Sequence, residues 1–243
     1  VDLGGNLLGL VRSPDAPVFG IDVSLQKARS ASLFAQTTTA ANLAAAPDLG
    51  AVLGIPGVFG TQPFASYVNQ LSAFTGGQLT LSNGIAFGER SIGNLSRPFF
   101  PDGINGSPNG PLSKPFDLWS PFSTGLQLEA DFVALATVLC QVAGTQVFTP
   151  LPGGPSLAQV FLTQLGVDCT LLPAVTSCTA ASLATIRNGL QIFPGAVPIY
   201  RGGTQIGAIG VSGDGVDQDD LVAFLGLHNA GVRLGGTLGN APL

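Results

Sequence analysis

The first 36 residues place apolar and polar side chains in short runs that predict strands and then a helix. Residues 1–3 and 7–12 predict two strand segments, and the Gly-Gly-Asn sequence at residues 4–6 predicts a turn between them. Residues 20–36 predict a helix, because apolar and small side chains recur at helical spacing while Lys27 and Arg29 fall off that face. The face comprises Ile21, Leu25, Ala28 and Ser32.

The end of the chain has the same pattern as its start, with predicted strands followed by a predicted helix. Residues 196–213 predict two strands that are joined by a turn at Gly202-Gly203. Residues 216–230 predict a closing helix with acidic residues in its first turn, where they complement the helix dipole, and with Gly231 as its stop.

The segment between these ends, residues 45–190, has a different pattern, which predicts mainly helices and loops. Helical periodicity predicts helices over residues 63–77, 126–143, 156–165 and 179–188. Residues 78–88 predict a hairpin, because Asn83-Gly84 favours a tight turn between alternating apolar residues. Residues 93–125 form a long loop rich in proline, glycine and serine, and its aromatic residues, including Trp119, favour a loop draped over a partner.

Composition points to protein partners. Charged residues are only 9% of the chain, against roughly 25% in ordinary soluble proteins. We therefore expect other subunits to cover much of the surface, in a homo-oligomer or in a complex with other proteins. Nine basic residues against fourteen acidic ones argue against nucleic acid as a partner. The longest apolar run, residues 132–144, is shorter than the roughly 18–20 residues that span a membrane, so no membrane-spanning helix is expected.

The start of the chain and its cysteines bear on location. The chain begins at Val1 and contains no methionine, so we expect a processed or partial product. Such processing is compatible with the removal of a signal peptide. Cys169 and Cys178 flank a short turn-prone segment and are candidates for a disulfide, with Cys140 left over. Three reduced, buried thiols are the alternative. A disulfide would fit a periplasmic or extracellular location.

Two blocks of motifs carry a family resemblance. The first contains a D-x-x-G turn (Asp2, Gly5), an Arg12, Asp15, Ala16 segment and a helix with Lys27, Ala28, Arg29, Ala31 and Phe34. The second is the strand from Gly207 to Gly213, followed by an acidic turn from Gln218 to Asp220. Together these blocks resemble the GlcG/HbpS-like haem-binding family. The central segment resembles a longer bacterial subgroup that carries the same "RPFFPDG" and "WSPFSTGLQL" sequences.

The resemblance implies a fold, an assembly and a ligand class. It implies an α+β, profilin-like domain, in which helices flank an antiparallel sheet, together with oligomerisation and, in some members, tetrapyrrole binding. We expect residues 1–44 and 191–243 to form that domain, with residues 45–190 as an insert of helices, a hairpin and a long loop. By resemblance the chain starts inside the first strand, so an upstream segment of the same precursor is expected to complete the sheet.

The acidic cluster of the second block has two explanations. Asp217, Asp219 and Asp220 lie where a helix begins, so their carboxylates are expected to cap free N–H groups. A metal site formed by Asp214, Asp217 and Asp219 is the alternative, although the spacing lacks the closing glutamate of an EF-hand. A phosphate loop is excluded, because no lysine follows the glycines in the required pattern.

A tetrapyrrole would need an iron ligand and cations for its carboxylates. His228 is the only histidine and a candidate ligand, since imidazole commonly holds haem iron; a buried structural role is the alternative. Candidate partners of the propionates are Tyr200, Arg201, Lys27 and Arg29; the alternative is that the three cations are ordinary surface charges. Gly207 and Gly210 leave room for a close approach of backbone or ligand.

Catalysis finds little support in the sequence. There is one histidine, no G-x-S-x-G motif and no paired metal ligands, and Glu129 and Asp131 near the start of a predicted helix are expected to act as caps. We therefore expect an exported, non-enzymatic protein that binds haem or a similar small planar ligand. The alternative is a structural or interaction subunit of a larger extracellular or periplasmic assembly.

Overall fold

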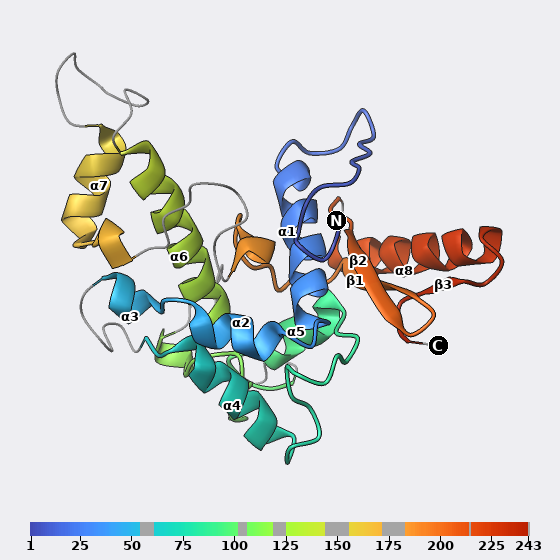
Figure 1. Cartoon of the computed structure of the whole chain (residues 1–243), viewed down its shortest axis with the longest axis horizontal. Helices are drawn as coiled ribbons and strands as arrows, with labels where there is room; N and C mark the ends of the chain where they lie inside the picture. The colour runs from blue at the N-terminus through green and yellow to red at the C-terminus, as the bar shows by residue number, and fades with distance from the viewer. Residues whose placement is uncertain are drawn as a thin grey trace.

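The computed structural model describes residues 1–53, 61–101, 106–118, 125–143, 156–171, 183–213 and 215–242. Its elements place it in the α+β class, as predicted, while the profilin-like arrangement stays a prediction (Figure 1). The order of elements is α1 (Gly20–Phe34), α2 (Thr39–Ala45), α3 (Leu49–Val52), α4 (Phe64–Phe74), α5 (Glu89–Leu95), η2 (Phe116–Leu118), α6 (Gly125–Val142), α7 (Leu157–Leu165), η3 (Cys169–Leu171), η4 (Ala184–Ile186), β1 (Ala196–Arg201), β2 (Thr204–Gly210), α8 (Val216–Arg233) and β3 (Leu238–Gly239).

The described strands form one antiparallel sheet in the order β2-β1-β3, with helices on both faces. Successive side chains of a strand point to opposite faces. Ala196 and Ala208 accordingly pack with Ala31 of α1, whereas Val197 packs with Ala223 and Leu227 of α8. Helix α1 therefore covers one face of the sheet and α8 covers the other.

Glycines let the sheet and α1 approach closely. A Cβ atom on Gly210 would lie only 2.2 Å from the backbone oxygen of Ser24 in α1. A Cβ atom on Gly207 would lie 2.1 Å from the backbone oxygen of Val1. The predicted close approach at these two glycines is therefore filled by the backbone of the chain itself.

The start of the chain reaches the sheet at one residue. The amino group of Val1 donates to the oxygen of Ala208 at 2.8 Å, and the amide of Ala208 donates to the oxygen of Val1 at 3.1 Å. The predicted turn is present, with Gly5 at a φ of 73°. The strand predicted over residues 7–12 is wrong, because this segment pairs with no described strand and lies exposed.

The end of α1 also contributes to a second core, formed by the central segment. Leu33 and Phe34 of α1 pack with Phe64, Tyr67 and Leu71 of α4, among other side chains. Helix α1 therefore stands between the sheet with α8 on one side and the central helices on the other (Figure 1). This position explains why residues 27–34 are buried all round the helix, rather than on the single face that periodicity predicted. The domain division at residues 44 and 191 stays a prediction.

The hairpin predicted over residues 78–88 is wrong. The turn forms, with Gly84 at a φ of 65°, but no strand flanks it. Leu79, Leu81, Ile85 and Phe87, the alternating apolar residues, instead pack into the core of the central helices. Tertiary burial has satisfied the apolar pattern without a ladder of backbone hydrogen bonds.

More of the predicted helices than of the predicted strands of these segments are confirmed by the structure. Helix α4 begins after Pro63, α6 covers the predicted range, and α7 begins at a capping box of Ser156 and Gln159 and ends at Gly166. Of the helix predicted over residues 179–188, the described part forms only the single turn η4. Helix α5 lies at the start of the predicted long loop, and Trp119 falls outside the described residues.

The last helix does not stop at Gly231. Helix α8 continues to Arg233, and Gly235 and Gly236 follow with positive φ angles. A Cβ atom on Gly231 would lie 2.5 Å from the backbone oxygen of Leu238, so this glycine admits β3 rather than ending the helix.

Helix α6 is longer than the apolar run, residues 132–144, on which the expectation of no membrane-spanning helix was based. With 18 residues and a mean hydropathy of 1.3 it is the one described helix that is long and apolar enough to cross a membrane by length and composition. The core helix of a soluble protein passes the same test, and Leu126, Ala130, Val133 and Ala136 of α6 pack into the central core. The absence of a membrane span stays a prediction.

Two carboxylates of α6, the buried Glu129 and the partly buried Asp131, bind groups of other segments rather than acting as caps. Glu129 accepts a hydrogen bond from the hydroxyl of Tyr67 at 2.8 Å and forms an ion pair with Lys114 at 2.8 Å. Asp131 accepts a hydrogen bond from the amide of Leu190, and burial raises its pKa to about 7. Both carboxylates thus hold loops against α6.

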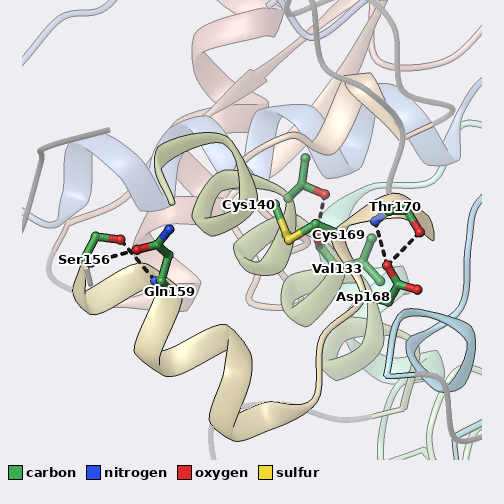
Figure 2. The surroundings of a disulfide bond; sticks show 8 residues. Val133, Cys140, Ser156, Gln159, Asp168, Cys169 and Thr170 are labelled. Carbon is green, nitrogen blue, oxygen red and sulfur yellow. Dashed lines mark hydrogen bonds between the residues drawn. A yellow bond between two sulfur atoms is a disulfide. The ribbon is translucent and has the colours of Figure 1, made fainter. Parts of the chain in front are cut away.

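The disulfide joins a different pair of cysteines from the one predicted. Cys140, near the end of α6, is bonded to Cys169 of η3, with the two Cα atoms 5.7 Å apart (Figure 2). The predicted partner, Cys178, lies outside the described residues. Sequence proximity favoured Cys178, but the return of the chain along α7 brings Cys169 back to the end of α6.

Candidate functional site

A groove opens beside the segment that links the start of the chain to α1. We call residues 9–19 the strap. Between the strap, the start of α1 and the end of β2 lies a cavity of about 560 Å³, and a second cavity of about 460 Å³ lies between the strap and the start of α8. The two share lining residues, so we treat them as one strap groove, of the size that small-molecule sites usually have. The shared residues are Ser13, Ala16, Pro17, Val211, Ser212 and Val222.

The strap is held in a defined shape by its own polar groups. The Arg12 guanidinium donates to the oxygen of Ala16 at 2.5 Å, and the amide of Ala16 donates to the oxygen of Ser13 at 3.2 Å. A hydrogen bond from Ser13 lowers the pKa of Asp15, which keeps that carboxyl ionised at the mouth of the groove. The groove therefore carries both a cation and an anion on the strap.

The walls of the groove combine apolar surface with a few polar groups. Leu10, Val11, Ile21, Ile209 and Leu221 add apolar surface to the shared lining residues. Arg12, Asp15, Gln218 and Asp219 supply polar atoms along its edge. Such a mixture of apolar walls and a small number of polar groups is typical of ligand sites.

The groove is where the two motif blocks meet. Arg12, Asp15 and Ala16 come from the first block, and Val211, Ser212 and Asp219 come from the second. Gly20 sets their distance, because a Cβ atom there would lie 3.3 Å from the backbone oxygen of Ser212. Residues that are about 200 positions apart in the sequence thus line one site.

A buried ion pair forms the floor of this region. The ammonium of Lys27 lies 2.9 Å from Asp219 and donates to the oxygen of Val211 at 3.1 Å. The side chains of Lys27 and Asp219 are 2% and 7% exposed, so water screens their attraction little. This pair ties α1 to the start of α8 and to the end of β2.

The neighbouring aspartates are also paired within the chain. Arg90 of α5 lies 2.6 Å from Asp217 and 2.8 Å from Asp220. Glu89 is fully buried next to them, and burial raises its pKa well above the usual range, with the charge of Asp220 adding to the effect and that of Lys27 opposing it. The start of α8 is thus fixed to α1 and α5 by charges.

These pairings bear on the predicted metal site. Asp217 and Asp219 each bind a cationic side chain of the protein, and Asp214 lies outside the described residues. Within the described ranges, no group of three or more His, Cys, Asp or Glu side chains is placed to hold a metal ion.

The residues predicted to hold propionates lie in separate places. Lys27 is engaged by Asp219, and Arg29 is buried and donates to the oxygen of Gly5 at 2.8 Å and to the side chain of Asn188. The hydroxyl of Tyr200 donates to the oxygen of Gly84 at 3.4 Å, and burial raises the pKa of Tyr200. Arg201 is exposed at the turn between β1 and β2.

His228 lies on the exposed side of α8 and does not line the strap groove. Sequence reasoning missed Arg90 and identified the strap only in part. Arg90 gave no local signal, because its partners are 127 and 130 positions away. The strap residues gave one signal, the motif that contains Arg12 and Asp15.

Comparison with known proteins supports the second motif block. A family model described as "Haem degrading protein HbpS-like" matches residues 163–228. The match begins in the last turn of α7 and continues through β1 and β2 into α8 as far as His228, and it includes the groove residues from Ile209 to Val222. No curated protein and no solved structure matches the chain. Over residues 163–228, this chain is similar to the HbpS-like family, as the second motif block predicted.

Proposed function

We propose that this chain binds a flat tetrapyrrole of the haem class in the strap groove, as a binding protein rather than an enzyme. The observation that carries the proposal is the convergence of the two motif blocks on one groove with apolar walls. The similarity to a family whose description names haem supports the same class of ligand. The apolar side chains of Val11, Ile209 and Val222 line the groove and suit contact with a planar ring.

The groove residues fit the ring of such a ligand better than they fit its iron. Arg12 lies at the edge, where a guanidinium binds a carboxylate well. The lining residues of the groove include no histidine, cysteine, methionine or tyrosine, the side chains that usually hold haem iron. The proposal therefore rests on contacts with the ring and its carboxylates, and we derive no step at a metal.

The test is a titration with two ligands that share the ring. Haemin and metal-free protoporphyrin IX are added to the purified chain, and binding is followed by absorbance and by quenching of protein fluorescence. Both are expected to bind with affinities within about tenfold of each other, because the ring supplies most of the contacts. Failure of both to bind, or binding of haemin alone, would overturn the proposal.

Variants locate the site. Arg12→Gln removes a charged hydrogen-bond donor and is expected to weaken both ligands by about 10- to 100-fold. Val222→Asp places a charge on the apolar wall and is expected to abolish binding. Arg201→Gln is the matched control, because this arginine is exposed away from the groove. Since His228 lies outside the groove, His228→Ala is expected to leave the absorbance spectrum unchanged.

We also propose a periplasmic or extracellular location. The bond between Cys140 and Cys169 supports it, because disulfides persist in oxidising compartments. The check is cell fractionation of the natural source, followed by intact-mass measurement before and after reduction. Recovery of the chain from the cytoplasm with free Cys140 and Cys169 would contradict this location.

The alternative function, an interaction subunit of a larger assembly, is favoured by a different observation. Helix α8 exposes Leu221, Val222, Leu225 and Val232 to solvent. Leu225 and Val232 lie outside the groove, so a small ligand there does not explain their exposure.

A further inference from the structure

Helix α8 has two apolar stripes, of which one faces the sheet. Ala223, Leu227 and Gly231 are buried against the sheet and β3. The second stripe consists of Leu221, Leu225, His228 and Val232, and we call it the α8 seam. Its apolar members are 64%, 51% and 64% exposed, respectively. Val222 and Phe224 flank the seam and are exposed as well, so the apolar surface is wider than a single row.

The spacing of the seam is that of a helix–helix interface. Its members are four, three and four positions apart, the alternation that keeps one row of side chains facing a partner helix. The spacing reads the same in both directions. Two copies of α8 that lie antiparallel would therefore place Leu221 across from Val232 and Leu225 across from His228, twice each, about a two-fold axis.

The charges at the two ends of α8 complement each other in that arrangement. Asp217 is exposed in the first turn, where it also pairs with Arg90, and Arg233 is exposed in the last turn. An antiparallel pair brings Arg233 of each helix to within about one turn of Asp217 in the other, and it also aligns the helix dipoles favourably. A parallel pair would bring Asp217 next to Asp217 and Arg233 next to Arg233.

We infer that the α8 seam is the interface of a homodimer in which two copies of this helix pack antiparallel about a two-fold axis. A second copy is the occupant that these observations favour, because the spacing and the charges of the seam complement themselves. The proposal goes beyond ligand binding. It also places the partner at the border of the strap groove, since Leu221 belongs to both surfaces.

The first test measures the oligomeric state of the full chain by sedimentation velocity over about 0.1 to 100 μM. The wild type is expected to form a dimer, and Leu225→Asp is expected to raise the dimer dissociation constant by at least about 100-fold, as for a central interface residue. His228→Leu is expected to lower it, because the seam loses its polar member. The matched control is Leu135→Asp, since Leu135 of α6 is 48% exposed and outside the seam.

A wild type that stays monomeric at 100 μM, or a dimer that Leu225→Asp leaves intact, would overturn the proposal. A monomeric wild type would mean that a different protein covers the seam. Circular dichroism and thermal unfolding of each variant separate loss of the dimer from loss of the fold.

The second test determines the orientation of the helices. One preparation carries Leu221→Cys and another carries Val232→Cys, and each is oxidised alone and after mixing. A cross-linked dimer is expected only in the mixture, because the antiparallel pair places residue 221 of one copy beside residue 232 of the other. Cross-linking of the Leu221→Cys preparation alone would contradict the antiparallel arrangement. The wild type, oxidised in parallel, controls for its native cysteines.

Discussion

The ion pair between Lys27 and Asp219 is expected to be a main support of the contact between α1 and α8. Lys27→Met removes the ammonium but keeps a side chain of similar length. Asp219 then remains buried without its cation, and Asp220 and the fully buried Glu89 are nearby. The variant also loses the hydrogen bond from Lys27 to the oxygen of Val211.

The size of the effect follows from the geometry. At 2.9 Å and an effective dielectric constant of about 20, the attraction between the two charges is about 6 kcal/mol. Desolvation offsets much of this attraction when both partners are present, but removal of one partner of a buried pair typically costs about 3–5 kcal/mol. For a chain of 243 residues, that cost corresponds to a fall in Tm of about 6–20 °C.

Urea unfolding followed by circular dichroism measures the free energy of unfolding of each variant. Arg201→Met, which removes an exposed cation, is expected to change it by less than about 0.5 kcal/mol. In the double variant Lys27→Met with Asp219→Leu no charge is left unpaired, so at least half of the stability should return. A loss below about 1 kcal/mol for Lys27→Met, or no recovery in the double variant, would refute the reasoning.

Three further predictions concern packing, pH and the disulfide. Gly210→Ala should lower the free energy of unfolding by about 1–3 kcal/mol or more, because its Cβ atom would lie 2.2 Å from a backbone oxygen. Gly226→Ala is the control and should raise the free energy of unfolding by about 0.5–1 kcal/mol, because a Cβ atom there meets nothing within 4 Å. Equal effects of the two substitutions in urea unfolding would contradict this prediction. Because burial raises the pKa of Asp131 to about 7 in the folded state, the folded chain binds more protons than the unfolded chain between about pH 4 and 7, so the contribution of this group to stability falls as pH rises. Asp131→Asn should therefore flatten the fall in wild-type stability over that range by up to about 4 kcal/mol, and identical pH profiles would count against it. Replacing both Cys140 and Cys169 by serine opens a loop with a sequence separation of 29 and should cost about 3–4 kcal/mol, and reduction of the wild type should cost about the same; no change in Tm on reduction would contradict the assignment.

Local rules were enough for most helices of the central segment. Ser156 and Gly166 delimit α7 by capping, and Pro63 precedes α4 as a residue that starts a helix well. These signals act within a few residues, so the sequence contains them completely. The same reasoning failed for residues 7–12 and 78–88, because a strand needs a partner and no local pattern specifies one.

The candidate site was predictable only in its pieces. The motif residues Arg12 and Asp15, and the motif from Gly207 to Gly213, were identified from the sequence. That they line one groove depends on the strap and on the close contact of Gly20 with Ser212. The pairing of Lys27 with Asp219 was also missed. The sequence suggested an exposed lysine, whereas the fold buries Lys27 in an ion pair with Asp219.

The sequence by itself determined the α+β class, the positions of the main helices and the resemblance to the HbpS-like family over the second motif block. Each of these depends on side-chain spacing or on residue identity within a short segment. Only the tertiary structure decided that Cys140 pairs with Cys169, that Arg90 binds the aspartates of α8 and that α8 leaves an apolar seam exposed. These features join residues far apart in the chain or depend on which face of a helix the rest of the fold covers. Contacts of that kind are set by packing, and no local pattern records them.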